Sequence, residues 1–321
     1  MGLLQCLGLR RRDQWQPPTL LDSLLLSPLT YLTSLFYQVV LLLRGHPFHP
    51  ARPKIRVVAI SDTHDQFVHI PPGDILVHAG DLTNEGTVRD IQKQIDWLKR
   101  QPHAVKVVVA GNHDSWFDPK SRRDEDVKSG AQVDLDGVVY LESQITVQEI
   151  RGRKVHIFGV PDIPNIGPPE FAFQYQPDEH PWLSKIPPET DILITHSPPK
   201  HHHDLALGDT NLLRELYRVR PRLHIFGHVH FGYGSSPAYY DDLQTAYERL
   251  MARPKRGWLR ECFPCDLWWD VATVLYLGLE SVAWKWLMGG PGSNRGGLMV
   301  NAAQMHGNTG KVRSRAVVID I

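Results

Sequence analysis

Aspartate, asparagine and histidine residues follow several short apolar runs of this 321-residue sequence, each at the point where a run ends. Short apolar runs bounded by turn residues are typical of buried strands in an α/β sheet. Because open α/β sheets bind ligands at the carboxyl ends of their strands, we expect these polar side chains to meet at one site. The residues are Asp62 and His64, Asp81, Asn112, His113 and Asp114, His196, and His228 and His230.

The chemistry of these side chains indicates a metal site. One residue separates Asp62 from His64 and His228 from His230, and side chains two residues apart point the same way in an extended backbone. Carboxylates, a carboxamide oxygen and imidazoles suit Mn²⁺, Fe and Zn²⁺, and no thiolate is among them. Any one of these residues alone would be an ordinary turn or structural residue, so the prediction rests on the whole set.

The elements that must hold these residues follow an α/β pattern. Apolar runs at 55–60, 76–79 and 106–110 predict strands, and a helix is expected at about 87–100, where apolar residues recur at helical spacing. Near-continuous apolar strands alternating with a helix favour a layered α/β core. Further strands are expected at 138–140, 145–149, 154–159, 191–195, 223–226, 298–302 and 316–321.

Five motifs carry a resemblance to a known family. They are Asp62-x-His64, Gly80-Asp81, Gly111-Asn112-His113-Asp114, Thr195-His196 and Gly227-His228-Val229-His230. In this order they resemble the calcineurin-like metallophosphoesterase family, closest to its branch of metallophosphoesterase-domain (brain-type) proteins and class III cyclic-nucleotide phosphodiesterases. The resemblance covers about 54–234 and resumes near 301–321. It implies an α/β fold, a four-layer αββα sandwich of two mixed β-sheets.

The resemblance also implies a role for each residue of the set. One divalent ion would be bound by Asp62, His64 and His230, a second by Asn112, His196 and His228, and Asp81 would bridge the two. Mn²⁺ is the first expectation for both ions, with Fe or Zn²⁺ as alternatives. A metal-bridging hydroxide would attack phosphorus, and His113 would protonate the leaving oxygen as general acid. Asp114 would either orient His113 or cap the next turn.

The expected function is therefore metal-dependent hydrolysis of a small-molecule phosphodiester, with cyclic nucleotides among the candidate substrates. A phosphomonoesterase or phosphoprotein phosphatase is the alternative among enzymes, because the same ligands serve both ester classes. A membrane-associated scaffold with an inactive metal site is the alternative from another class. The formal net charge of zero argues against a broad nucleic-acid-binding surface. The oligomeric state and the native metal pair cannot be read from the sequence.

The catalytic domain is expected at 54–321, preceded by an N-terminal apolar segment and linker at 1–53. Residues 24–43 form a charge-free apolar run that Pro28 and a few polar residues dilute. Three interpretations compete: a membrane anchor, a helix that lies in the membrane interface or packs on the domain, and a targeting segment.

A Trp-rich helical insertion interrupts the domain at about 235–295. Charges at Asp270, Glu280 and Lys285 argue against a transmembrane span there. The insertion is expected either to pack over the domain, against residues 20–43, or to contact a membrane or a partner. Association with a membrane would then use 20–43 and 266–288.

Cysteine use bears on the compartment. The three cysteines, Cys6, Cys262 and Cys265, are too few for a disulfide framework and favour a reducing environment. Cys262 and Cys265 have the spacing of a redox pair or half a zinc site, but no second cysteine pair completes such a site. We expect an intracellular protein, either cytoplasmic or attached to a membrane.

Overall fold

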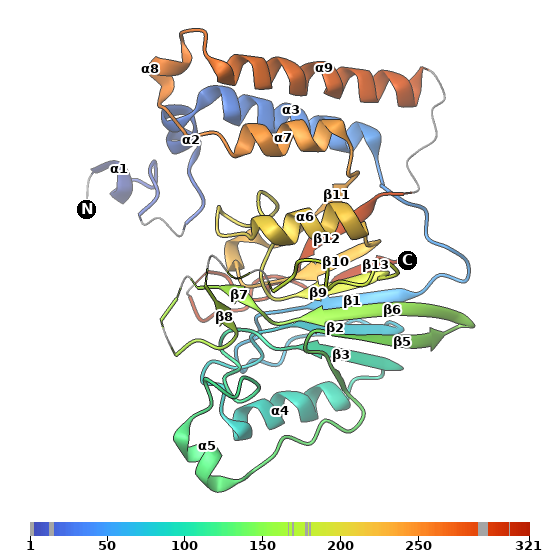
Figure 1. The fold of residues 1–321 in the computed structure, drawn as a ribbon. Helices are drawn as coiled ribbons and strands as arrows, with labels where there is room; N and C mark the ends of the chain where they lie inside the picture. The colour runs from blue at the N-terminus through green and yellow to red at the C-terminus, as the bar shows by residue number, and fades with distance from the viewer. Residues whose placement is uncertain are drawn as a thin grey trace. The chain divides into compact units, whose positions relative to one another are not determined.

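The computed structural model describes residues 3–12, 16–165, 167–168, 170–176, 179, 181–287, 295–307 and 309–321. The chain divides into two compact units (Figure 1). The sheet unit comprises His49–Ser236 and Gly297–Ile321, and the helical unit comprises Met1–Phe48 and Pro237–Gly296. The N-terminal segment and the insertion thus belong to one unit. The part of the predicted insertion at 288–294 lies outside the described residues.

The first sheet of the sheet unit has the strand order β13-β1-β2-β3-β4. Strands β1 to β4 are parallel, and β13 pairs with β1 in the antiparallel sense. Both faces of the central strands are buried, which explains their continuous apolar sequences. The bounds are β1 (Arg56–Ile60), β2 (Ile75–Ala79), β3 (Val105–Val109), β4 (Val139–Tyr140) and β13 (Val317–Asp320).

The second sheet has the order β11-β12-β10-β9-β6-β5. Strands β12, β10, β9 and β6 are parallel, and β5 is antiparallel to β6. A separate parallel pair consists of β7 (Ile163–Pro164) and β8 (Gln174–Tyr175). The bounds are β5 (Gln144–Ile150), β6 (Arg153–Val160), β9 (Ile192–Thr195), β10 (Leu223–Phe226), β11 (Gly234–Ala238) and β12 (Gly297–Asn301).

The two sheets pack face to face between two layers of helix. Figure 1 shows α4 (Val88–Lys99) outside the first sheet and α6 (Thr210–Val219) outside the second, with α5 (Asp124–Ser129) beyond α4. A Cβ atom at Gly159 of β6 would lie 2.7 Å from Cγ2 of Val109 in β3, so glycine there lets the sheets approach closely. The predicted αββα sandwich is confirmed.

Helix α4 forms where helical spacing predicted it. The Thr87 side chain accepts a hydrogen bond from the Asp90 amide and so caps the first turn. The apolar stripe of the helix, which includes Ile91 and Ile95, is fully buried against β1, β2 and β3. This packing holds the helix against the face opposite the second sheet.

The helical unit has its own core. Helix α3 (Pro28–Arg44) packs against α7 (Asp242–Met251) and α9 (Asp266–Trp286). The rings of Tyr37 and Tyr247 stack with centroids 3.9 Å apart, and a Cβ at Gly278 would lie 2.5 Å from Phe36. The N-terminal apolar run and the insertion therefore bury each other. The remaining helices of the unit are α1 (Leu3–Cys6), α2 (Leu20–Leu26) and α8 (Trp258–Glu261).

The apolar run at 24–43 does not form a single helix. Ser27 and Pro28 divide it, so that α2 has 7 residues and α3 has 17. Within the described ranges, no helix is both long and apolar enough to cross a bilayer. The apolar residues of this run are thus divided between two helices.

Candidate metal centre

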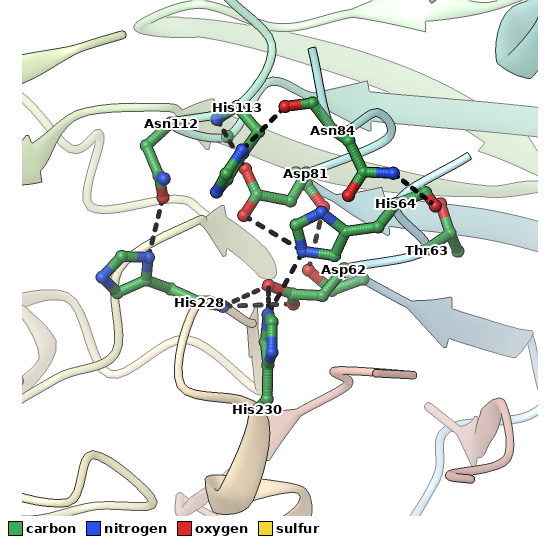
Figure 2. A network of polar contacts seen from close by, with 12 residues as sticks. Asp62, Thr63, His64, Asp81, Asn84, Asn112, His113, His228 and His230 are labelled. Atoms are coloured by element: carbon green, nitrogen blue, oxygen red, sulfur yellow. Dashed lines mark hydrogen bonds and ion pairs between the residues drawn. The ribbon is translucent and has the colours of Figure 1, made fainter. Parts of the chain in front are cut away.

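Five strands of the sheet unit deliver the predicted ligands to one place. Asp62 and His64 follow β1, Asp81 follows β2, and Asn112 follows β3. From the second sheet, His196 follows β9, while His228 and the short 3₁₀ turn at His230–Gly232 follow β10. Figure 2 shows side chains from both sheets turned toward each other.

The backbone at these strand ends is unusual. Asp62, His64, Asp81 and His228 all have left-handed backbones, with φ angles of 53°, 45°, 53° and 64°. Non-glycine residues in this conformation cost roughly 1–3 kcal/mol each and cluster at functional sites. The pairs Asp62/His64 and His228/His230 do converge. The prediction that these pairs lie in extended backbone is wrong. Left-handed residues in tight turns orient their side chains toward the site.

The first group of candidate ligands consists of Asp62, His64, Asp81 and His230. One ligand atom from each lies within 4.8 Å of all the others. The Nε2 atoms of His64 and His230 are 3.2 Å apart, and His230 Nε2 is 3.3 Å from Oδ1 of Asp62. Two ring nitrogens and a carboxylate oxygen at such separations can share one cation.

The second group consists of Asp81, His196 and His228, joined by Asn112. His196 Nε2 lies 3.3 Å from Oδ2 of Asp81 and 3.0 Å from Oδ1 of Asn112. Nδ1 of His228 lies 2.8 Å from the same Asn112 oxygen. Asp81 Oδ2 is also 3.6 Å from His64 Nε2, so this carboxylate faces both groups.

Backbone carbonyls orient two of the imidazoles for metal binding. Nδ1 of His196 donates to the carbonyl of Ala79 at 2.8 Å, and Nδ1 of His230 donates to that of Gly307 at 2.8 Å. Because a carbonyl only accepts, each Nδ1 carries a proton, and Nε2 is the nitrogen that faces the other candidate ligands. This is the usual outer contact of a metal-binding histidine.

Two glycines make room for the carboxylates. A Cβ at Gly111 would lie 2.2 Å from Oδ1 of Asp81, and a Cβ at Gly227 would lie 2.1 Å from Oδ2 of Asp62. Any side chain at these positions would displace a candidate ligand. The donor atoms, their orientation and the space around them all fit a pair of divalent ions.

The electrostatics keep both carboxylates ionised. Burial raises the pKa of Asp62, but the hydrogen bond and charge of His230 outweigh it and lower the pKa to about 2. Burial likewise opposes ionisation of Asp81, yet His196 and His113 hold its pKa well below the ordinary value. Burial lowers the pKa of His228 to about 4, which leaves that ring neutral and able to bind a cation.

His113 stands beside the two groups. Its backbone amide donates to Oδ1 of Asp81 at 2.9 Å, and its ring centroid is 5.0 Å from that of His64. Nδ1 donates to the carbonyl of Asn84 at 2.9 Å (Figure 2), which leaves Nε2 as the nitrogen that can exchange a proton. The ring of Phe171 packs on the imidazole at 4.8 Å.

Asp114 does not orient His113. Its buried carboxylate accepts hydrogen bonds from the amides of Leu82, Thr83 and Gly111 and from the Thr83 hydroxyl. It therefore ties the loop of Asp81 to the loop of Asn112. Burial and the charge of Asp81 raise the pKa of Asp114 to about 7. The expected orienting role is wrong, because Asn84 makes that contact.

Sequence reasoning missed Asn84 and Phe171. Asn84 lies three residues after Asp81 in the same turn, and its side-chain amide also donates to the His64 carbonyl at 3.2 Å. Its proximity to a candidate ligand was the available signal. Phe171 comes from the loop after β7, and nothing in its local sequence marks it.

Residues 55–232 match the family described as Calcineurin-like phosphoesterase. This match covers more than half of the chain and contains every candidate ligand. The chain belongs to this family. Membership agrees with the resemblance carried by the five motifs, and it identifies the two ligand groups as the plausible metal site of a phosphoesterase fold.

Curated relatives of this chain differ in how much of it they share. Metallophosphoesterase domain-containing protein 1 of Homo sapiens is 35% identical over 209 residues, which is 56% of this chain and 61% of that protein. A UPF0046 protein of Caenorhabditis elegans is 36% identical over 197 residues, 57% of this chain and 66% of its own. The chain thus spans less than two thirds of the length of either relative.

A fungal relative shares more of the chain. A protein of Emericella nidulans named "Probable rhamnogalacturonate lyase C" is 36% identical over 271 residues, 83% of this chain but only 24% of that protein. The sheet unit alone does not contain 83% of the chain, so this match extends into the helical unit. Part of the sequence of the helical unit is therefore shared with that relative.

Proposed function

We propose that this phosphoesterase hydrolyses phosphodiesters with the help of two divalent metal ions. The observation that carries the proposal is Asp81, whose carboxylate faces two separate groups of ligands. A carboxylate shared by two cations is what a dinuclear hydrolase requires. Family membership supports the hydrolase class, and the specificity for diesters is our inference.

Seven side chains would hold the ions. Asp62, His64 and His230 face one position, Asn112, His196 and His228 face the other, and Asp81 belongs to both. When bound, divalent ions would neutralise charge on the phosphoryl oxygens and make a nearby water more acidic. Oxygen and imidazole donors suit Mn²⁺, and Fe and Zn²⁺ remain alternatives.

His113 would supply the proton for the leaving oxygen. Its Nδ1–H is held by the Asn84 carbonyl, so the proton that leaves the ring must come from Nε2. Phe171 covers one side of the ring and limits its rotation. Positioned proton donors of this kind contribute roughly 10²–10⁴-fold to a rate.

The charges around the site favour a diester over a monoester. In the part of the chain that the structure describes, no Lys or Arg forms a hydrogen bond or ion pair with the seven candidate ligands or with His113. A diester carries one negative charge at phosphorus and a monoester up to two. Without further cations the site suits the less charged group.

A substrate comparison tests the proposal. The Mn²⁺-loaded full chain should hydrolyse bis-p-nitrophenyl phosphate faster than p-nitrophenyl phosphate, and a panel of cyclic nucleotides would narrow the substrate. The Asp81→Asn variant is the control for contaminating activity. Preference for the monoester would refute the diester assignment, while no hydrolysis of any phosphoester with metal supplied would favour the inactive-site alternative.

A further inference from the structure

The turn between α7 and α9 carries exposed cations interleaved with exposed apolar side chains. We define residues 255–263 as the basic-aromatic segment. Its cations are Lys255, Arg256 and Arg260. All three are exposed, and Phe263 beside them is 70% exposed. Trp258 and Leu259 of α8 are also exposed, so this turn offers charge and apolar area together.

The outward charge of this segment is positive because its acidic residue faces inward. Glu261 is buried, and its carboxylate accepts hydrogen bonds from the Ser27 hydroxyl and the Leu29 amide. Among the described residues of the helical unit, the nearby carboxylates of Asp266 and Asp270 pair with Arg249 and Arg253. No ion pair of the described chain involves Lys255, Arg256 or Arg260.

Helix α9 adds a row of aromatic and aliphatic side chains. Trp269, Tyr276 and Leu279 are spaced by seven and three residues, which places them on one face of the helix. All three are exposed, Trp269 by 75%. The face that packs in the core is the one that contains Val274 and Gly278. This row therefore has no partner among the described residues of its unit.

Helix α3 repeats the pattern. Leu32, Leu35, Val39 and Leu42 recur along one face and are exposed, whereas Thr33, Tyr37 and Val40 on other faces are buried. Apolar surface of this extent on a folded unit marks an interaction site. Helices α3 and α9 and the basic-aromatic segment thus expose apolar side chains whose contact with water is unfavourable.

We propose that the helical unit docks on an anionic membrane surface through the basic-aromatic segment and the exposed row of α9. Trp and Tyr favour the boundary between lipid and water, and Leu and Phe gain from entering the acyl region. Lys and Arg can extend along this apolar surface and meet lipid phosphates. A protein partner fits less well, because the cores of protein interfaces are depleted in Lys.

Vesicle binding by the full chain tests the proposal. The chain should co-sediment with phosphatidylcholine vesicles that contain phosphatidylserine, and much less with phosphatidylcholine alone. The variant Lys255→Gln/Arg256→Gln/Arg260→Gln should bind the anionic vesicles about a hundredfold more weakly, since each cation near such a surface contributes about fivefold. The variant Leu259→Ser/Phe263→Ser should weaken binding to both vesicles.

A matched control distinguishes binding through this surface from nonspecific adsorption to vesicles. Val127→Ser/Lys128→Gln changes one exposed apolar residue and one exposed cation in α5 of the sheet unit and should leave vesicle binding unchanged. Each variant should keep the hydrolytic rate in solution, since all candidate ligands lie in the sheet unit. Equal binding by the triple variant and the wild type would overturn the proposal.

Self-association is the competing outcome. If the apolar surface seats a second copy of the chain, the wild type will be dimeric in solution and will not bind anionic vesicles. Leu259→Ser/Phe263→Ser will then be monomeric by sedimentation equilibrium. That result would also overturn membrane docking, and it would leave the proposed hydrolysis untouched.

Discussion

The two units of the chain differ in what they bury and in what they expose. The sheet unit buries polar groups: Asp62, Asp81, Asn112 and His196 are all nearly inaccessible. The helical unit also buries a few charged groups, such as Glu261 and Asp270, but it differs in exposing many apolar side chains. Of the 29 exposed large hydrophobic side chains among the described residues, 7 lie in the sheet unit and the rest in the helical unit.

This contrast separates two tasks. Buried polar groups are costly unless they pair or bind an ion, so their concentration at five strand ends indicates chemistry. Exposed apolar side chains are costly in water, so their concentration on α3, α8 and α9 indicates a surface that becomes covered. We infer that the sheet unit carries the reaction and the helical unit determines where it takes place.

The largest expected effect comes from the shared carboxylate. Asp81→Asn should lower the content of both metal ions and reduce hydrolysis by at least about 10⁴-fold, the upper end of what one positioned group contributes. His64→Ala should chiefly weaken one ion. Metal analysis and the bis-p-nitrophenyl phosphate rate measure both effects. If Asp81→Asn keeps two ions and the full rate, the carboxylate is not shared.

The same variant sharpens the contrast between the units. Asp81→Asn should bind anionic vesicles as the wild type does, because none of the candidate ligands belongs to the helical unit. Loss of vesicle binding in this variant would show that the two tasks are coupled.

Removal of the proton donor should have the next largest effect. His113→Gln should retain both metal ions and lose roughly 10²–10⁴-fold in rate. The loss should be greater for a diester with an alkyl leaving group than for one with a nitrophenyl group, because nitrophenolate leaves without a proton. An equal loss for both leaving groups would show that His113 acts only in binding.

A stability variant tests whether the helical unit is dispensable for chemistry. Asp270 is buried and pairs with Arg249 and Arg253 at 2.9 Å and 2.6 Å. Asp270→Ala should lower the thermal transition of the helical unit, because it removes the buried carboxylate through which Arg249 and Arg253 are tied to α9. The hydrolytic rate at temperatures below the new transition should not change.

The control for that variant is Asp242→Ala, which removes an exposed carboxylate from the first turn of α7 in the same unit. It should shift the thermal transition much less. A fall in hydrolytic rate that parallels the loss of helical structure in Asp270→Ala would contradict the division of tasks.

The smallest expected effect concerns Phe171. Replacing this ring by leucine removes the aromatic contact with His113, which is worth about 1 kcal/mol or about a fivefold change in rate. Phe171→Leu should therefore lower turnover by fivefold or less and leave the metal content unchanged. Phe67→Leu, an exposed aromatic of the same unit, is the matched control. A change in metal content would place Phe171 in a structural role.

Much of the site could be read from the sequence because its signals are local. A strand of four or five apolar residues that ends on Asp, Asn or His is visible without any long-range information, as at Leu76–Asp81. The contacts of Asn84 and Asp114 are not of this kind. The turn geometry decides that Asn84, and not Asp114, contacts the His113 ring. The left-handed residues Asp62, His64 and Asp81 set that geometry.

The strand patterns of the sequence by themselves predicted a layered α/β core, because such patterns are encoded by neighbouring residues. The resemblance carried by five short motifs implied the αββα sandwich, the seven candidate ligands and the family. Only the tertiary structure decided that α3 and α9, more than 200 residues apart in the chain, share one core. Hydropathy measures how apolar a segment is and not where the helix breaks or which face is covered. The break at Ser27 and Pro28 has a local cause, because proline can start a helix but cannot continue one. The outward face of α9 is decided by packing.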